Sequence, residues 1–126
     1  PQNLYSIPNL NIVYKKNLSD EEIATNVNES IACFALYKSG ANSGVVPVAL
    51  MCGTPILASR IKVFENYGLL NKENCLFIED HNNRSEIKQA LEFIKSNFDV
   101  MSKAAKESYL RSFDDHKCSE YYPWYF

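Results

Sequence analysis

The sequence lacks the basic excess that a general nucleic-acid-binding protein carries. Its 126 residues include 13 Lys and Arg against 15 Asp and Glu, which gives a formal net charge of -2. A nucleic-acid-binding surface would require a surplus or a stripe of basic side chains. Nucleic acid is therefore not an expected partner, whereas a neutral or phosphorylated small ligand is compatible with this charge.

The sequence also lacks the cysteine spacings of a metal site. Its four cysteines form no CxxC pair, and no histidine lies at ligand spacing from them. Cys33, Cys52 and Cys75 lie in apolar runs, where a free cysteine packs as a small hydrophobic residue. Together with Cys118, they are predicted to be free thiols and not disulfides or metal ligands. We expect no metal cofactor and a reducing, cytoplasmic compartment.

Segments for export or membrane insertion are not recognisable. There is no signal peptide, and no apolar run is long enough to span a bilayer. The chain begins at Pro1 and not at a methionine, so we expect further sequence upstream. A length of 126 residues suits one hydrophobic core. We therefore interpret residues 1–126 as a single, truncated domain.

Short apolar runs alternate with helical patterns along the chain. Residues 31–37 form a continuous apolar run, which is typical of a strand buried on both faces. Strands separated by helices predict right-handed βαβ units, and hence an α/β, Rossmann-like parallel sheet flanked by helices. The strands are expected at residues 11–14, 31–37, 56–59 and 75–78.

Helix ends are marked by local signals. Ser19 and Glu22 have the spacing of a capping box, with Ile23, Val27 and Ile31 on the helical face behind it. Pro47 and Gly53 suit the first turn and the end of a helix over residues 45–52. Further helices are expected at residues 63–70 and 99–113, and one capped by Asn83 and Glu86 carries an apolar stripe. That stripe consists of Ile87, Ala90, Leu91, Ile94 and Phe98.

The loop of residues 38–44 leaves a strand and enters a helix. Open parallel sheets bind ligands at the carboxyl ends of their strands. Ser43 is the expected N-cap, and Gly44 leaves room for a ligand against the backbone. The amides of Val45 and Val46 would then face a ligand with the positive end of the helix dipole, as in phosphate sites.

Residues 37–59 resemble a variant motif of retaining glycosyltransferases with the GT-B fold, of the group 1 or family 4 type. In both, a tyrosine and a small loop precede Ser-Gly, here Ser43-Gly44, and an apolar helix follows. Gly-x-Pro, here residues 53–55, then leads into a strand that ends in Ala-Ser. Glu65 and residues 74–78 extend the match, with Cys75 where the family usually has glycine. The resemblance covers most of residues 10–113.

The resemblance implies that the chain is part of the C-terminal half of a GT-B fold, which binds a nucleotide-diphosphate sugar. A hexosyltransferase-type activity in polysaccharide or glycolipid assembly would follow, at the inner face of the membrane. The acceptor would be bound by an N-terminal domain that this chain lacks, so the isolated chain is expected to be inactive. The implied donor-binding residues are Asn42, Ser43, Gly44, Val45 and Val46, with Lys38 and Glu65 as further candidates.

The sequence departs from the family where many members carry two glutamates that grip the donor. The aligned positions hold Gly40 and Val48. This departure favours an alternative, a non-catalytic Rossmann-like module for binding or protein association. Unpaired strand edges and the aromatic tail of residues 121–126 would also favour self-association.

No catalytic residue can be named from the sequence. Transfer would rest on positioning and on stabilisation of the departing diphosphate by helix amides. Arg60 and Lys62 follow another strand and are either solvated or close to a phosphate. His81 and His116 are interpreted as loop histidines beside acidic residues, without a catalytic or metal role.

Overall fold

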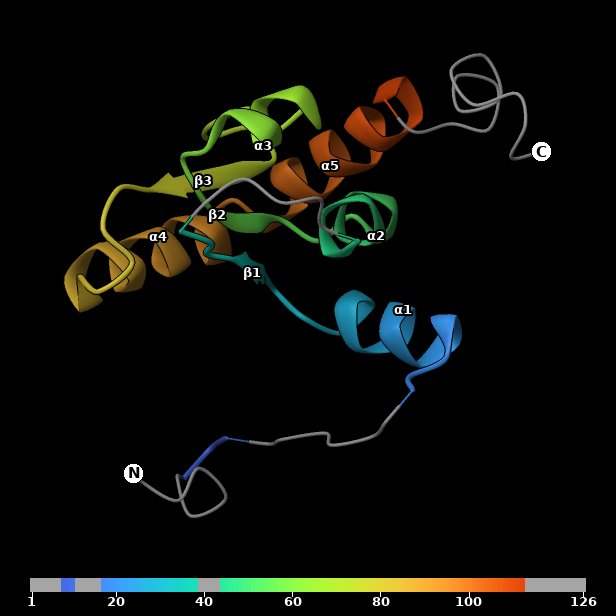
Figure 1. Ribbon diagram of the computed structural model, residues 1–126, viewed down its shortest axis with the longest axis horizontal. Helices are drawn as coiled ribbons and strands as arrows, with labels where there is room; N and C mark the ends of the chain where they lie inside the picture. The colour runs from blue at the N-terminus through green and yellow to red at the C-terminus, as the bar shows by residue number, and fades with distance from the viewer. Residues whose placement is uncertain (1–7, 11–16, 39–43, 113–126) are drawn as a thin grey trace.

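A sheet of three parallel strands forms the centre of the molecule, shown as a computed structural model in Figure 1. The structure describes residues 8–10, 17–38 and 44–112. The strands are β1 (Cys33–Ala35), β2 (Ile56–Ser59) and β3 (Cys75–Ile78), and they lie in the order β1-β2-β3. This confirms the expected α/β class and the expected bounds of β2 and β3. The strand predicted at residues 11–14 lies outside the described residues.

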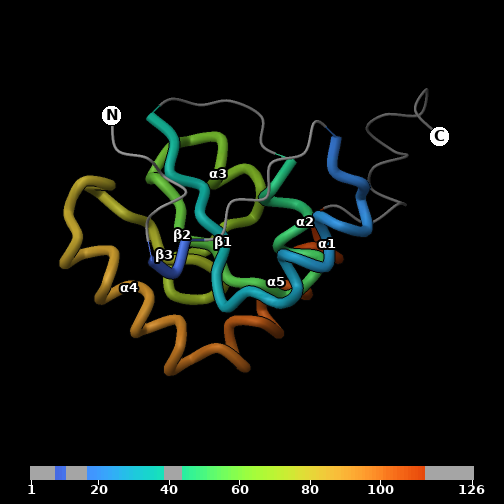
Figure 2. The backbone as a smooth tube through the Cα atoms, turned by 90° about the horizontal axis from the view of Figure 1, so that it is seen from below, coloured from blue at the N-terminus to red at the C-terminus, as the bar shows by residue number. Residues whose placement is uncertain are grey.

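Helices cover both faces of this sheet. α4 packs on one face, whereas α1, α2, α3 and α5 contribute to the hydrophobic cluster on the other. Figure 2 shows the strands side by side at the centre, with α4 on one side and α2 and α5 on the other. The helices are α1 (Asp20–Asn28), α2 (Val45–Cys52), α3 (Lys62–Asn66), α4 (Arg84–Ser96) and α5 (Phe98–Ser112).

The predicted capping box starts α1. The Ser19 amide donates to Glu22 Oε2 at 2.8 Å, and the Glu22 amide donates to Ser19 Oγ at 3.1 Å. Two of the amides that lack partners at a helix start are therefore satisfied. The prediction that the helical face extends to Ile31 was wrong, because α1 ends at Asn28 and Ile31 is 50% exposed.

The apolar helix α2 is short and closely packed. Its N-cap is Gly44, which has no side chain to cap with, so the prediction of Ser43 as the cap was wrong by one position. Ser43 itself lies outside the described residues. The helix ends as predicted at Gly53, whose φ of 73° suits glycine. A Cβ at Gly53 would lie 2.6 Å from Lys106 Cε, so α5 packs directly against this turn.

The apolar run predicted a strand buried on both faces, and for β1 this prediction was wrong. It comprises residues 33–35 only; Ala35 is fully buried, whereas Phe34 is 52% exposed. Phe34 lies in register with Leu57 of β2, which is buried in the cluster beneath α4. α4 covers the β2 and β3 part of that face, and β1 ends the described sheet. The Phe34 side chain is therefore left half exposed and is not part of the hydrophobic cluster that packs with α4.

The α4 stripe packs against the sheet as predicted. Asn83 Oδ1 accepts a hydrogen bond from the Glu86 amide at 3.1 Å and caps the helix. Ile94 is fully buried and Ala90 is 5% exposed, with Ile87 and Leu91 packed around them. Phe98, assigned to the same stripe, is instead the first residue of α5.

A buried asparagine fixes the start of β3 to α5. Asn74 is fully buried, and its Nδ2 donates to the Gly68 carbonyl at 2.9 Å and to Ser108 Oγ at 2.7 Å. Its Oδ1 accepts from the Leu70 amide at 2.9 Å. The chain turns at Gly68, whose φ is 80°, which is why the helix predicted at residues 63–70 is shorter. A buried polar side chain with its bonds made specifies one arrangement of these segments.

We expect the Ile94→Ala substitution to lower the free energy of unfolding by about 2–5 kcal/mol, because it leaves a cavity beneath the sheet. Denaturant unfolding of the 126-residue chain measures this loss. The exposed Lys88 on the same helix provides the control, since Lys88→Ala should cost less than about 0.5 kcal/mol. Similar losses in both variants would contradict the packing of α4 on the sheet.

Candidate functional site

A cavity of about 350 Å³ opens at the carboxyl ends of the three strands. This is the edge at which open parallel sheets bind ligands. The volume lies at the lower end of the range of about 300–1,000 Å³ that is typical of small-molecule sites. The described lining residues follow each strand in turn: Tyr37 and Lys38 after β1, Ser59, Arg60 and Ile61 at the end of β2, and Ile78, Glu79, His81 and Asn82 at the end of β3.

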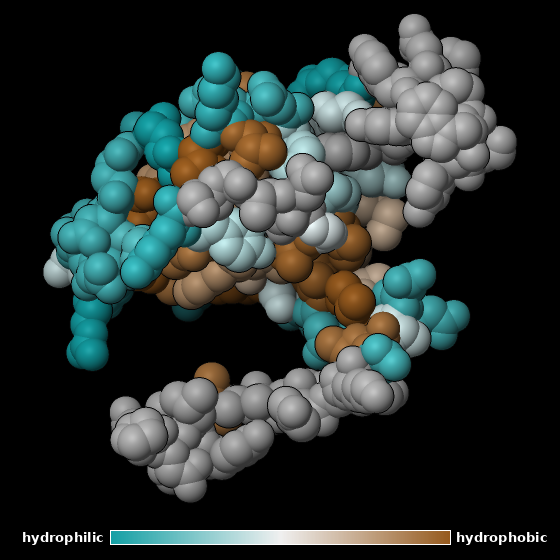
Figure 3. Space-filling view, in the orientation of Figure 1, coloured by the Kyte–Doolittle hydropathy of each residue, from teal (hydrophilic) through white to brown (hydrophobic). Residues whose placement is uncertain are grey.

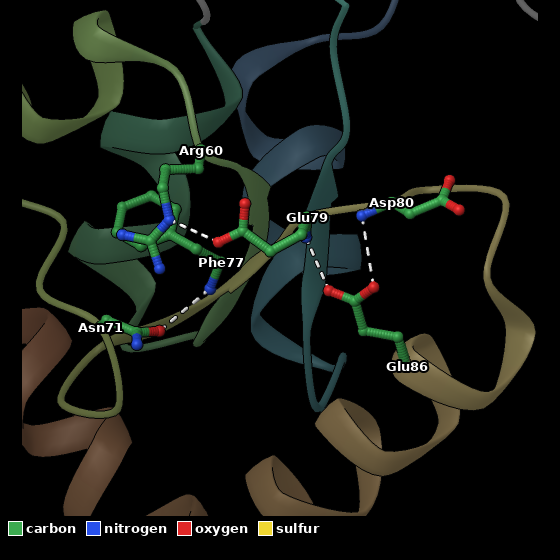
Figure 4. Close-up of polar contacts among 6 residues, drawn as sticks. All are labelled: Arg60, Asn71, Phe77, Glu79, Asp80 and Glu86. Carbon is green, nitrogen blue, oxygen red and sulfur yellow. Dashed lines mark hydrogen bonds and ion pairs between the residues drawn. The ribbon is translucent and has the colours of Figure 1, made fainter.

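Arg60 and Glu79 join the ends of β2 and β3 across this cavity. Arg60 Nε donates to Glu79 Oε1 at 2.6 Å, and the guanidinium carbon lies 4.8 Å from the centroid of the Phe77 ring (Figure 4). The side chains are 45% and 66% exposed, respectively. Ion pairs this exposed contribute little to stability, because water screens them. The pair therefore orients the Arg60 side chain but contributes little to the stability of the fold.

Glu86 holds the backbone that follows β3. Its Oε1 accepts from the Glu79 amide at 2.6 Å, and its Oε2 accepts from the Asp80 amide at 3.2 Å (Figure 4). The Asn82 amide in turn donates to Asp80 Oδ1 at 2.9 Å. A single carboxylate from the first turn of α4 thus sets the path of one wall of the cavity.

Ser59 is the last residue of β2 and one of the residues that line the cavity. The residue is 7% exposed, and its Oγ is buried without a hydrogen-bond partner in the described part of the chain. Buried hydroxyl groups are normally paired. The Ser59 hydroxyl is therefore an exception among buried polar groups, in a residue that lines the cavity.

Aromatic rings support the side of the cavity formed after β1. The Tyr37 ring centroid lies 5.8 Å from that of Phe64, and Phe64 lies 6.3 Å from Tyr67. Phe64 is fully buried in the core cluster. Tyr37 therefore connects this wall of the cavity to the buried core, and the exposed Lys38 follows it in the wall.

The structure brings only some of the predicted site residues to this cavity. Lys38 lines it. Gly44, Val45 and Val46 form the start of α2, and neither they nor Glu65, which is exposed on α3, are among the described lining residues. Asn42 and Ser43 lie outside the described residues.

The start of α2 nevertheless presents backbone donors. Val45 and Val46 are in the first turn, where amides have no carbonyl partner within the helix. Val46 is fully buried, so its side chain takes no part in binding. Pro47 is the third helical residue and has no N–H, which removes a donor that most helix starts offer.

Sequence reasoning missed Ser59, Glu79 and Asn82 as lining residues. Arg60 was noted as a residue following a strand, and His81, interpreted as a loop histidine, also lines the cavity. The available signal was the polar residue at the end of each buried strand. The pairing of Arg60 with Glu79 was not visible, because these residues are 19 positions apart.

The cysteines in the described residues are free. Burial raises the pKa of the Cys75 thiol to about 12, and that of the half-buried Cys33 to about 11. Burial also raises the pKa of the half-buried Cys52. Thiols with raised pKa values are poor nucleophiles at neutral pH, so these side chains serve packing. Cys118 lies outside the described residues.

The described part of the chain contains neither a metal-binding cluster nor a membrane-spanning helix. Within it, no group of three or more His, Cys, Asp or Glu side chains is arranged to hold a metal ion. None of its helices is long and apolar enough to cross a bilayer.

Comparisons with known proteins do not assign the chain to a family. No protein-family model, no curated protein and no solved structure matches it.

We expect Glu86→Ala to lower the free energy of unfolding by about 1–2 kcal/mol, because the Glu79 and Asp80 amides lose a charged acceptor. Glu92→Ala is the matched control, since Glu92 is an exposed glutamate of the same helix. Its loss should stay below about 0.5 kcal/mol. Thermal and denaturant unfolding measure both, and an equal loss would contradict the role assigned to Glu86.

Proposed function

We propose that this chain is the donor-binding part of a glycosyltransferase and binds a nucleotide-diphosphate sugar. The observation that carries the proposal is the layout of residues 44–59, which matches the block on which the resemblance rests. Helix α2 begins directly after Gly44 and ends at Gly53, and the next residues lead into the central strand β2, all of whose residues are buried.

The start of α2 provides the chemistry for a diphosphate. The amides of Val45 and Val46 point from a helix start, where the dipole favours negative charge. A Cβ added to Gly44 would have no heavy atom within 4 Å among the described residues. The described residues therefore leave room for a ligand to approach the backbone at this position.

In this proposal, the domain contributes binding and charge stabilisation and supplies no side-chain nucleophile. Helix amides would stabilise the charge that develops on the departing diphosphate. The sugar acceptor would be bound by an N-terminal domain. The transfer would take place at the inner, cytoplasmic face of a membrane. The 126-residue chain by itself would therefore bind the donor weakly and transfer no sugar.

Gly44→Val tests the location. The Gly44 backbone is helical, with φ of -70°, and space for the side chain is open, so the variant should fold normally. We expect it to weaken the binding of uridine or guanosine diphosphate by about tenfold or more in calorimetry, through loss of close contact with the amides. Amide shifts of Val45 and Val46 should report binding in the unmodified chain.

Met51→Ala provides the control for this experiment. Met51 is 45% exposed near the other end of the same helix, so its loss should leave diphosphate affinity unchanged. Equal binding by the unmodified chain and by Gly44→Val would exclude the start of α2 as the diphosphate site.

A second candidate function is protein association without catalysis. It is favoured by the composition of α2, whose first turn contains no acidic residue to bind donor hydroxyls. It is also favoured by Ile31, which precedes β1 and is 50% exposed, and by Phe34 of β1, the last strand of the described sheet, which is 52% exposed. Figure 3 shows hydrophobic residues at the surface between α1 and the body of the molecule. Exposed apolar surface of this kind promotes association.

If this surface drives self-association, Phe34→Glu should shift the chain toward monomer, because a carboxylate would be buried in the contact. Val100→Glu is the matched control, since Val100 is 74% exposed on α5. Sedimentation velocity over a range of concentrations measures both variants. A strictly monomeric unmodified chain, or equal dissociation of the two variants, would rule out this surface.

A further inference from the structure

We propose that the cavity at the carboxyl ends of β1, β2 and β3 is a binding site for a phosphoryl group of a small ligand, with Ser59 and Arg60 as its principal donors. None of the described residues of α2 lines this cavity. The proposed phosphoryl site therefore uses other described residues than the diphosphate site proposed at Val45 and Val46, and it does not depend on the glycosyltransferase assignment.

Ser59 is the first argument. Ser59 is among the residues that line the cavity, and its Oγ is buried without a hydrogen-bond partner in the described residues. Leaving a buried hydroxyl unpaired destabilises the folded chain. A ligand oxygen that accepts from this hydroxyl would remove that penalty, which makes ligand binding the natural explanation for a serine at this position.

The charges of the lining residues are the second argument. Lys38 and Arg60 contribute two cations, and Glu79 is the acidic residue among the described lining residues. His81 and Asn82 add further polar groups at the same edge. This balance favours an anion. A phosphoryl group fits better than a single acceptor atom, because its several oxygens can accept from Ser59, Arg60 and Lys38 together.

The way Arg60 is held is the third argument. Glu79 engages only Nε of the guanidinium, and the Phe77 ring lies against its face. The terminal N–H groups are left without a partner among the described residues. Arginine presents its donors as a planar fork that matches phosphate oxygens, so Arg60 is oriented for an anion and still has donors to offer (Figure 4).

The experiment is a titration of the 126-residue chain with inorganic phosphate, at constant ionic strength set by sodium chloride. Amide shifts of residues 59–61 report occupancy of the cavity. We expect Ser59→Ala to weaken phosphate binding by about tenfold, through loss of a hydrogen bond to a charged group. The melting temperature without phosphate should be unchanged or higher, because the substitution also removes an unpaired buried hydroxyl.

Changes of charge give effects of opposite sign. Arg60→Gln should weaken binding by about tenfold, whereas Glu79→Gln should strengthen it by about threefold, since a like charge is removed from the anion's surroundings. Lys62→Gln is the control: Lys62 is an exposed cation two residues from Arg60 and is not among the described lining residues. It should leave the affinity within about twofold of the unmodified chain, because exposed charges are screened.

Each alternative outcome overturns the proposal. No phosphate-dependent shift at residues 59–61 would show that the cavity is not a phosphoryl site. Equal losses in Arg60→Gln and Lys62→Gln would indicate only a general effect of charge. Loss of phosphate binding in Gly44→Val with full binding in Ser59→Ala would place the anion on the α2 amides. That last result would leave the glycosyltransferase proposal standing, so the two proposals fail separately.

Discussion

The complete burial of β2 is the constraint on which the rest of the structure depends. All of its residues are buried, with α4 below and the helices of the larger cluster above. A strand in this position satisfies its backbone only through neighbours on both sides, and β1 and β3 provide them in parallel register. Because parallel neighbours need crossover connections, α2 and α3 follow from the same requirement.

This arrangement also explains where polar groups collect. A parallel sheet places the carboxyl ends of its strands at one edge, so polar residues at or just after the end of each strand lie close together there. Lys38, Ser59 and Glu79 are such residues, and the cavity lies among them. The local bonds of Glu86 and the Arg60 pair then fix the edge, without contributing much to the burial that stabilises the fold.

Local signals were sufficient to predict much of the fold. Features that depend on neighbouring residues in the chain were predicted and confirmed. They are the caps at Ser19 and Asn83, the bounds of β2 and β3, and the end of α2 at Gly53. The exposure of Phe34 was not predictable in the same way, because it depends on how far α4 extends beneath the sheet. An apolar run indicates a strand, but not how many of its faces are covered.

The candidate site likewise has one part that local sequence signals predict and one part that only the folded chain shows. A helix start such as Val45 can be recognised from the sequence alone, because its free amides come with the backbone. The cavity needs residues from three strand ends, and its most informative member is a buried hydroxyl whose lack of a partner exists only in the folded chain. The absence of acidic side chains in the first turn of α2 adds to this contrast. Charged and polar side chains at this edge of the sheet are therefore provided by residues such as Ser59, which ends β2, and Arg60, which follows it, whereas the described start of α2 presents backbone amides.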